Sequence, residues 1–159
     1  MHAPGPLAAL HIAALGVWIG AGVAAHLALA RAASAGETPD GLARRRRAQR
    51  LLVLEHAALT LALLSGLLLM RSLGWGLGHA RWLGVKLGLV VFLVVPLEAM
   101  HAYVSHVWIA RGLLQTEAPP FSKDLSRGIG MEEMVRTLEL LLLGIAVPAL
   151  IWLSFAHPF

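Results

Sequence analysis

KLGLVVFLVVPLEAMHAYVSH, residues 86–106, is the stretch that decides the fold, because an apolar run leads directly into ionisable side chains. Its first half has the composition of a membrane-spanning helix, since a bilayer core about 30 Å thick takes about 20 apolar helical residues. Pro96, Glu98, His101 and His106 then follow within a few turns. The stretch is therefore either the end of a span that meets water or a polar site inside the bilayer.

The composition favours the membrane. Of 159 residues, 58% are hydrophobic and only 14% are charged, whereas a soluble domain of this size needs a larger charged surface. We expect a multi-pass protein of the bacterial inner membrane, with the lipid bilayer as partner. The absence of cysteine excludes disulfides, thiolate metal sites, iron–sulfur clusters and covalently attached haem. The net charge of +4 comes from short basic connections and predicts no nucleic-acid partner.

Four apolar runs are long enough to span a bilayer, at about 6–30, 50–70, 82–109 and 133–157. Together they predict an all-α, four-helix transmembrane bundle that forms a single domain over residues 1–159. Most arginines fall in the connections 31–50 and 110–136, and few fall in 71–81. The positive-inside rule therefore predicts that both termini lie on the outer, periplasmic side.

Ionisable residues inside spans are rare and usually face the bundle interior. On the predicted topology, six of them lie at similar depth in the inner half and come from all four helices: His26, Glu55, His56, Glu98, His101 and Glu139. A smaller pair, His11 and Lys86, lies in the outer half, with His79 and His157 as further candidates.

Local patterns add three expectations. The small-residue pattern GVWIG (16–20) predicts close helix packing, and Trp18 within it is expected to face the bundle. Pro96 is expected to kink the third helix and to free a carbonyl one turn earlier. His106 follows His101 by five residues, which is about 140° around an α-helix, so it is expected to point elsewhere.

The six-residue group allows several kinds of chemistry. Imidazoles on facing helices can hold a haem iron from both sides, and His56 with His101 is the predicted pair, with His26 as the alternative partner. The string EAMH (98–101) is one Glu-x-x-His motif, the unit of di-iron carboxylate sites, but it occurs only once. A non-haem site for iron, copper or zinc would use the following residues: Glu55, His56, Glu98, His101 and Glu139. In a third reading the polar residues only lock helices or bind a pigment within a larger complex.

Four segments resemble the HemJ-type protoporphyrinogen oxidases and, more loosely, the CopD-like four-helix membrane proteins. These segments are LHIAALGVWIGAG (10–22), RRAQRLLVLEHAALTLALLSGLLLM (46–70), RWLGVKLGLVVFLVV (81–95) and VRTLELLLLGIAVPALIWLSFAHPF (135–159). The resemblance implies bound haem b and oxidation of protoporphyrinogen IX to protoporphyrin IX. The porphyrin is then the substrate, and electrons pass from haem to a membrane acceptor such as a quinone. By position it assigns functional roles to His11 and Lys86.

The chain departs from that family at two places, and Glu55, His56 and Glu98 are further residues that the family does not lead us to expect. Pro96–Leu97 stands where the third helix of the family usually has Tyr-His. In the fourth helix the family typically has Asn-Glu and then a proline, whereas this chain has Leu138–Glu139 with no proline nearby. The leading hypothesis is a haem-b membrane oxidoreductase, with His11 and Lys86 as catalytic residues and His26, His56 and His101 as cofactor ligands. A homo-oligomer and a larger membrane complex both stay open.

Overall fold

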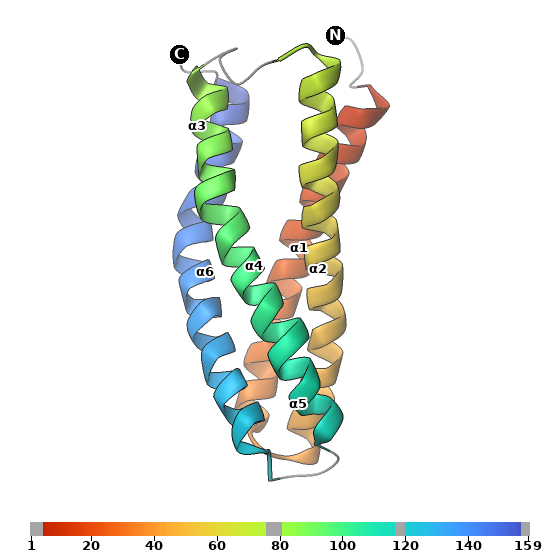
Figure 1. Cartoon of the computed structure of the whole chain (residues 1–159), viewed down its shortest axis with the longest axis vertical. Coiled ribbons are helices and arrows are strands. Elements are labelled where there is room, and N and C mark those ends of the chain that lie inside the picture. The colour runs from red at the N-terminus through yellow and green to blue at the C-terminus, as the bar shows by residue number, and fades with distance from the viewer. Residues whose placement is uncertain (1–4, 76–80, 117–119, 157–159) are drawn as a thin grey trace.

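The computed structural model describes residues 5–75, 81–116 and 120–156, and these are helical apart from short connections and contain no strand. The first two spans are α1 (Pro6–Ala35) and α2 (Pro39–Ser72), and the fourth is α6 (Lys123–Ala156). The third is one rod of five consecutive segments (Figure 1): α3 (Arg81–Leu89), η1 (Val90–Val94), α4 (Val95–Tyr103), η2 (Val104–Ile109) and α5 (Ala110–Gln115). The all-α prediction is confirmed.

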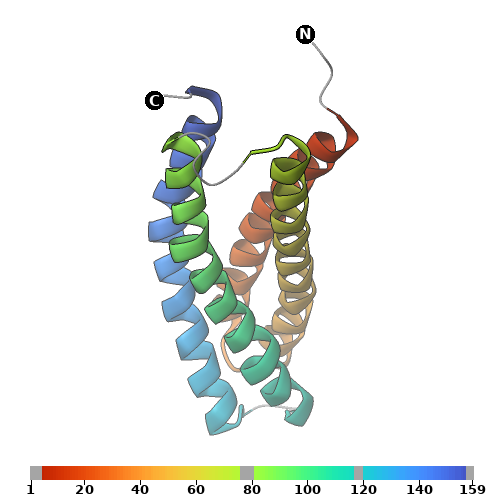
Figure 2. The ribbon, with the colours of Figure 1, turned by 45° about the horizontal axis from the view of Figure 1, so that its top comes forward.

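The helices form an up-and-down bundle. α1 packs along α2, and the third rod packs along α6 (Figures 1 and 2). α1 begins and α6 ends at the same end of the bundle, which we call the terminal end. The opposite end, where α1 turns into α2 and the third rod leads to α6, carries the exposed arginines of α2 and is called the basic end.

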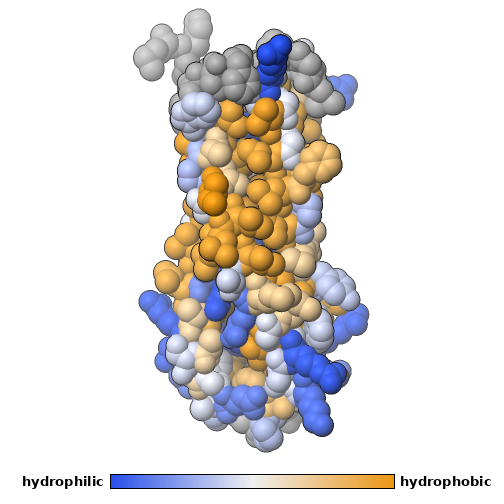
Figure 3. Space-filling model, turned by 90° about the vertical axis from the view of Figure 1, so that its left-hand side faces the viewer, coloured by the Kyte–Doolittle hydropathy of each residue, from blue (hydrophilic) through white to orange (hydrophobic). Residues whose placement is uncertain are grey.

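Four helices are long and apolar enough to cross a membrane. Many large apolar side chains point outward, among them Phe92, 83% exposed, and Ile145, 75% exposed. Figure 3 shows a broad apolar band on one face, with hydrophilic side chains gathered towards the basic end. Such an apolar surface is far larger than soluble monomers expose, whereas lipid tails solvate it well. These features support a multi-pass membrane protein.

The turn between α1 and α2 is tighter than predicted. Gly36 adopts a positive φ of 62°, and the Thr38 side chain caps α2 by accepting a hydrogen bond from Gly41 N at 3.0 Å. A Cβ on Gly41 would lie 2.2 Å from the Gly36 carbonyl oxygen, so only glycine fits there. The predicted connection 31–50 is therefore wrong, because α2 already begins at Pro39 and its arginines are helical. Most of the predicted connection 110–136 is likewise helical.

The third rod is irregular where proline predicts it. η1 is π-helical and ends two residues before Pro96, and the Val95 N–H bonds the Val90 carbonyl five residues back. Proline has no N–H and crowds the preceding turn, which explains a widened turn at this point. A second π-helical segment, η2, follows His101 within three residues. Such segments often occur at functional sites.

The GVWIG pattern does not pack within the bundle as predicted. Gly16 and Gly20 are exposed, and a Cβ on either would meet nothing within 4 Å. The close contact is instead made by Gly22, whose missing side chain leaves room for Glu55. Trp18 is 6% exposed, which confirms that it faces the interior.

A buried ion pair that the sequence did not reveal fastens the basic end. The Arg45 guanidinium donates to the Glu132 carboxylate, and both side chains are almost fully buried. Ser105 donates to the second Glu132 oxygen at 3.2 Å. Because Arg45 belongs to α2, Ser105 to η2 and Glu132 to α6, this contact joins three spans.

Arg45→Met should lower the free energy of unfolding by about 3–5 kcal/mol, because Glu132 would be left as an uncompensated buried charge. Thermal unfolding in detergent measures the change. Arg47→Met, at an exposed position two residues on, is the matched control and should unfold like the parent. Adding Glu132→Gln to Arg45→Met should restore part of the loss; a double variant less stable than the single one would contradict this account.

Candidate functional site

The six intramembrane residues predicted to lie at one depth come together in space. His26 lies on α1, Glu55 and His56 on α2, Glu98 and His101 on α4, and Glu139 on α6. Each of the four spans therefore contributes at least one side chain. We call these six residues the His/Glu cluster.

His101 lies at the centre of the cluster and is completely buried. Its Nδ1 is 2.8 Å from Glu139 Oε2, which is also 3.5 Å from His26 Nε2. The His101 ring centroid is 6.1 Å from that of His26 and 5.5 Å from that of His56. His56 Nε2 in turn lies 3.5 Å from Glu98 Oε2. The result is a chain of imidazole and carboxylate groups across the bundle.

Glu55 enters the cluster through the gap at Gly22. A Cβ at Gly22 would lie 2.7 Å from Glu55 Oε1, so the carboxylate reaches this position only because residue 22 has no side chain. The Glu55 side chain is buried, and its Oε2 has no hydrogen-bond partner. A carboxylate held in an apolar interior without partners is strongly unfavourable unless something compensates for it.

Backbone contacts fix the tautomers of two cluster histidines. His26 Nδ1 is 2.8 Å from the Gly22 carbonyl, and His56 Nδ1 is 2.7 Å from the Leu52 carbonyl. A carbonyl only accepts, so Nδ1 carries a proton in both rings, and in the neutral ring Nε2 presents a lone pair. Metal-binding histidines are commonly oriented in this way, with the other ring N–H donated to a backbone carbonyl.

Nε2 of each of these two histidines faces a carboxylate oxygen rather than a donor. His101 Nδ1 and Glu139 Oε2 pair with each other at 2.8 Å. Six further buried atoms of the cluster have no hydrogen-bond partner among the described residues: His26 Nε2, Glu55 Oε2, His56 Nε2, Glu98 Oε2, His101 Nε2 and Glu139 Oε1. Buried polar atoms in folded proteins almost always have partners, and a bound ion is one explanation for a group of exceptions.

The spacing of the pairs suits a shared ion. Two ligand atoms at about 2.0–2.2 Å from one tetrahedral metal lie about 3.4 Å apart. His26 Nε2 and Glu139 Oε2 are 3.5 Å apart, as are His56 Nε2 and Glu98 Oε2. Within the described part of the chain, no three such side chains already surround a single point, so binding requires the pairs to close around the ion.

His106 belongs with this group, and the prediction that it points elsewhere is wrong. Its Nε2 is 3.0 Å from His56 Nδ1, and the two ring centroids are 4.9 Å apart. The prediction assumed α-helical geometry, but His106 lies in the π-helical η2. A π-helix turns less per residue, so residues five apart come closer to one face. Pro96 does not predict the second π-helical segment, η2.

Trp18 is a second contact that sequence reasoning missed, although its inward orientation was expected. Its Nε1 donates to Glu98 Oε1 at 2.9 Å, and this bond is buried. The bond leaves only Glu98 Oε2 without a partner, and that oxygen faces His56. Trp18 therefore orients one carboxylate of the His/Glu cluster.

His11 and Lys86 lie apart from the cluster, towards the terminal end. Both border an apolar cavity of about 490 Å³ that is lined by residues of all four spans, including Trp18. His11 Nδ1 is 2.9 Å from the Ala62 carbonyl, and Lys86 Nζ donates to Ser154 Oγ at 2.7 Å. The other candidates for this region, His79 and His157, lie outside the described residues.

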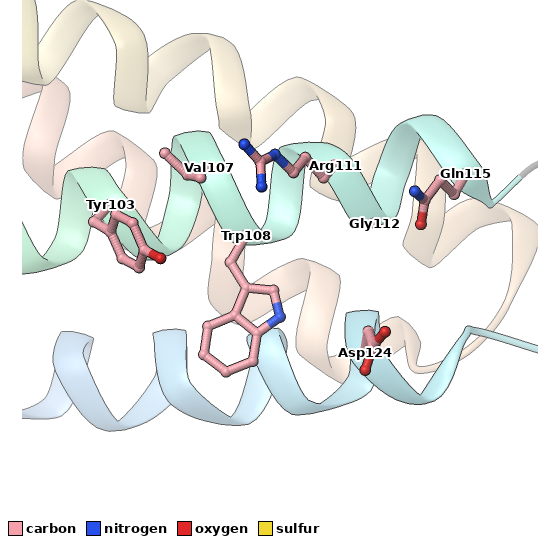
Figure 4. A pocket seen from close by; sticks show the side chains of 7 residues that line it. All are labelled: Tyr103, Val107, Trp108, Arg111, Gly112, Gln115 and Asp124. Atoms are coloured by element: carbon pink, nitrogen blue, oxygen red, sulfur yellow. The ribbon is translucent and has the colours of Figure 1, made fainter.

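A second hollow of about 420 Å³ lies on the surface near the basic end. Figure 4 shows Tyr103, Trp108, Arg111 and Gln115 on the third rod and Asp124 on α6. Aromatic and basic side chains of this kind are typical of the membrane–water interface. This hollow is separate from the His/Glu cluster and shares no residue with it.

Comparison of the chain with protein-family models, with curated proteins and with solved structures gives no match. The structure therefore defines a class only: an all-α bundle with four helices able to cross a membrane and a buried His/Glu cluster. The resemblance to the protoporphyrinogen oxidases stays a prediction.

Trp18→Phe should destabilise the protein by about 1–3 kcal/mol, because Glu98 Oε1 would lose its donor inside the bundle. Thermal unfolding in detergent measures the effect. Trp152→Phe removes an exposed indole from α6 and serves as the control, with little change expected. Equal unfolding temperatures for the Trp18 variant and the parent would show that the bond to Glu98 contributes nothing.

Proposed function

We propose that the protein binds a transition-metal ion inside the membrane through its His/Glu cluster. The observation that carries the proposal is the group of buried imidazole and carboxylate atoms without partners, drawn from four helices. The ligands would be His26 and His56 through Nε2, together with His101 and the three carboxylates of Glu55, Glu98 and Glu139. Nitrogen and oxygen donors in this mixture suit iron, copper or zinc.

The donor set resembles a carboxylate site built in the core of a helix bundle. Such di-iron sites combine Glu-x-x-His motifs with a glutamate from each of two other helices. Here Glu98 and His101 form the motif, and Glu55 and Glu139 supply the two further carboxylates. The second Glu-x-x-His motif is missing, and His26 and His56 take its place. Bound iron or copper would supply redox chemistry, while this chain holds the ion and excludes water around it.

Haem at this cluster has less support from the geometry. His56 and His101 were the expected axial pair, but their rings meet edge to face, with centroids 5.5 Å apart and planes at 79°. A porphyrin between them would require this contact to open. The haem-b oxidoreductase and the non-catalytic pigment-binding subunit remain as predictions, and the spectrum of the purified protein separates them from a metal ion alone.

We further propose that the basic end faces the cytoplasm of a bacterial inner membrane. Four arginines on the first turns of α2 are exposed there: Arg44, Arg46, Arg47 and Arg50. Basic residues near span ends favour the cytoplasmic side. The terminal end would then be periplasmic.

The protein purified without added chelator should contain about one or two equivalents of metal per chain. Glu139→Gln and His101→Ala should reduce metal content at least tenfold, since loss of a ligand outweighs the 10- to 100-fold effect of outer-shell changes. Elemental analysis measures the metal, and gel filtration verifies folding.

Glu133→Gln, at an exposed position on the same helix, is the matched control and should retain the metal. A metal-free parent protein, or equal metal content in the Glu139 and Glu133 variants, would refute the proposal. A Soret band that disappears in His56→Ala or His101→Ala would support haem in its place.

Single cysteines test the orientation, because the chain has none of its own. Ser72→Cys, at the exposed C-terminal end of α2, should react with a membrane-impermeant maleimide in cells with a permeable outer membrane. Ser126→Cys, exposed at the basic end, should react only after lysis. The reverse labelling pattern would invert the proposed topology.

A further inference from the structure

The cavity in the terminal half of the bundle is bordered by two polar groups of opposite character. Its walls are mostly aliphatic, from residues such as Leu15, Leu63 and Val90, and its volume of about 490 Å³ lies within the range of small-molecule sites. His11 and Lys86 lie on this wall from α1 and α3. A ligand of this cavity therefore needs an apolar body and polar groups that match His11 and Lys86.

His11 offers an acceptor. Its Nδ1 lies 2.9 Å from the Ala62 carbonyl and 3.3 Å from Ser65 Oγ. Because the carbonyl only accepts, Nδ1 carries the proton and Nε2 presents a lone pair. No hydrogen bond from a described residue occupies that Nε2, so it is available to a ligand hydroxyl.

Lys86 offers a donor. Its Nζ donates one hydrogen to Ser154 Oγ, and the Ser154 hydroxyl donates in turn to the Leu150 carbonyl at 2.8 Å. An ammonium has three hydrogens, so Lys86 retains donors for a ligand oxygen. Among the described residues that border the cavity there is no carboxylate to pair with it.

We propose that this cavity binds a lipid-soluble quinol. A quinol is a flat apolar ring with a hydroxyl at each end, and a hydroxyl both donates and accepts. One hydroxyl donates to His11 Nε2, and the other accepts from Lys86 Nζ. The oxidised quinone has only carbonyl oxygens, which accept from Lys86 but offer nothing to the His11 lone pair. The site therefore prefers the reduced ring.

Binding in the cavity does not depend on the metal site, although Trp18 borders the cavity and bonds Glu98 of the His/Glu cluster. The quinol proposal can therefore be wrong while the metal proposal is right, and the metal proposal can be wrong while the quinol proposal is right. Metal content of each variant, measured beside ligand affinity, keeps the two outcomes separate.

Calorimetric titration of the purified protein, cleared of co-purified quinone, tests the site with ubiquinol-1 under anaerobic conditions and with ubiquinone-1. We expect one ubiquinol-1 per chain and weaker binding of ubiquinone-1. His11→Leu should weaken ubiquinol-1 at least about tenfold, as loss of a hydrogen bond that leaves a polar group unpaired does, while ubiquinone-1 is little affected. Lys86→Met should weaken both forms to a similar degree. Lys123→Met, at the other lysine of the chain and at the basic end, should change neither.

Three results would overturn the proposal: no saturable ubiquinol-1 binding, equal affinity for the two oxidation states in the parent, or unchanged affinity in both the His11 and Lys86 variants. Oleate serves as the comparison ligand. If oleate bound in a Lys86-dependent manner while ubiquinol-1 did not bind, the cavity would be a site for carboxylate amphiphiles and the quinol assignment would be wrong. Gel filtration verifies that the variants are folded.

Discussion

The carboxylate of Glu139 lies between two imidazoles inside a bundle whose outer surface is suited to lipid. A carboxylate in that environment cannot be solvated by water, so it must be compensated by neighbouring groups. His101 from α4 meets that requirement at 2.8 Å, and it can do so only if the third rod and α6 hold their observed positions. The packing of the third rod against α6 therefore keeps a partner beside one buried carboxylate.

The same requirement explains why two polar centres are stacked along the bundle axis. Arg45 and Glu132 neutralise each other near the basic end, with Ser105 satisfying the remaining carboxylate oxygen. That pair is complete within the chain. The His/Glu cluster is not complete in this sense, because His26 and His56 direct Nδ1 to backbone carbonyls and their Nε2 atoms form no hydrogen bond with a described residue. The first centre is structural in character, whereas the unpaired atoms of the second are the basis of the proposed metal site.

The sequence predicted what depends on hydropathy and spacing within one helix. Four spans, the inward face of Trp18 and the irregularity before Pro96 follow from such local rules. Contacts between residues on different helices were harder to predict. The Arg45–Glu132 pair was missed because both residues were assigned to connections. In the structure Arg45 lies in α2, which begins at Pro39 after the turn at Gly36 and is capped by Thr38, and Glu132 lies in α6. His106 was misplaced because nothing in its neighbourhood marks a π-helical segment.

The partner of the His/Glu cluster can be narrowed by the distances themselves. If protons alone compensated the carboxylates, His56 and Glu98 would be expected to form a hydrogen bond, with nitrogen and oxygen about 2.7–3.2 Å apart. The observed separation is 3.5 Å, and the same value holds for His26 and Glu139. These two separations are close to the spacing of two ligands on one ion, which agrees with the proposed cation. The third pair, His101 Nδ1 and Glu139 Oε2, lies at hydrogen-bond distance, 2.8 Å. Gly22 bears on the same proposal, because its missing side chain admits a third carboxyl group, Glu55, which without a cation has to be protonated to avoid repulsion.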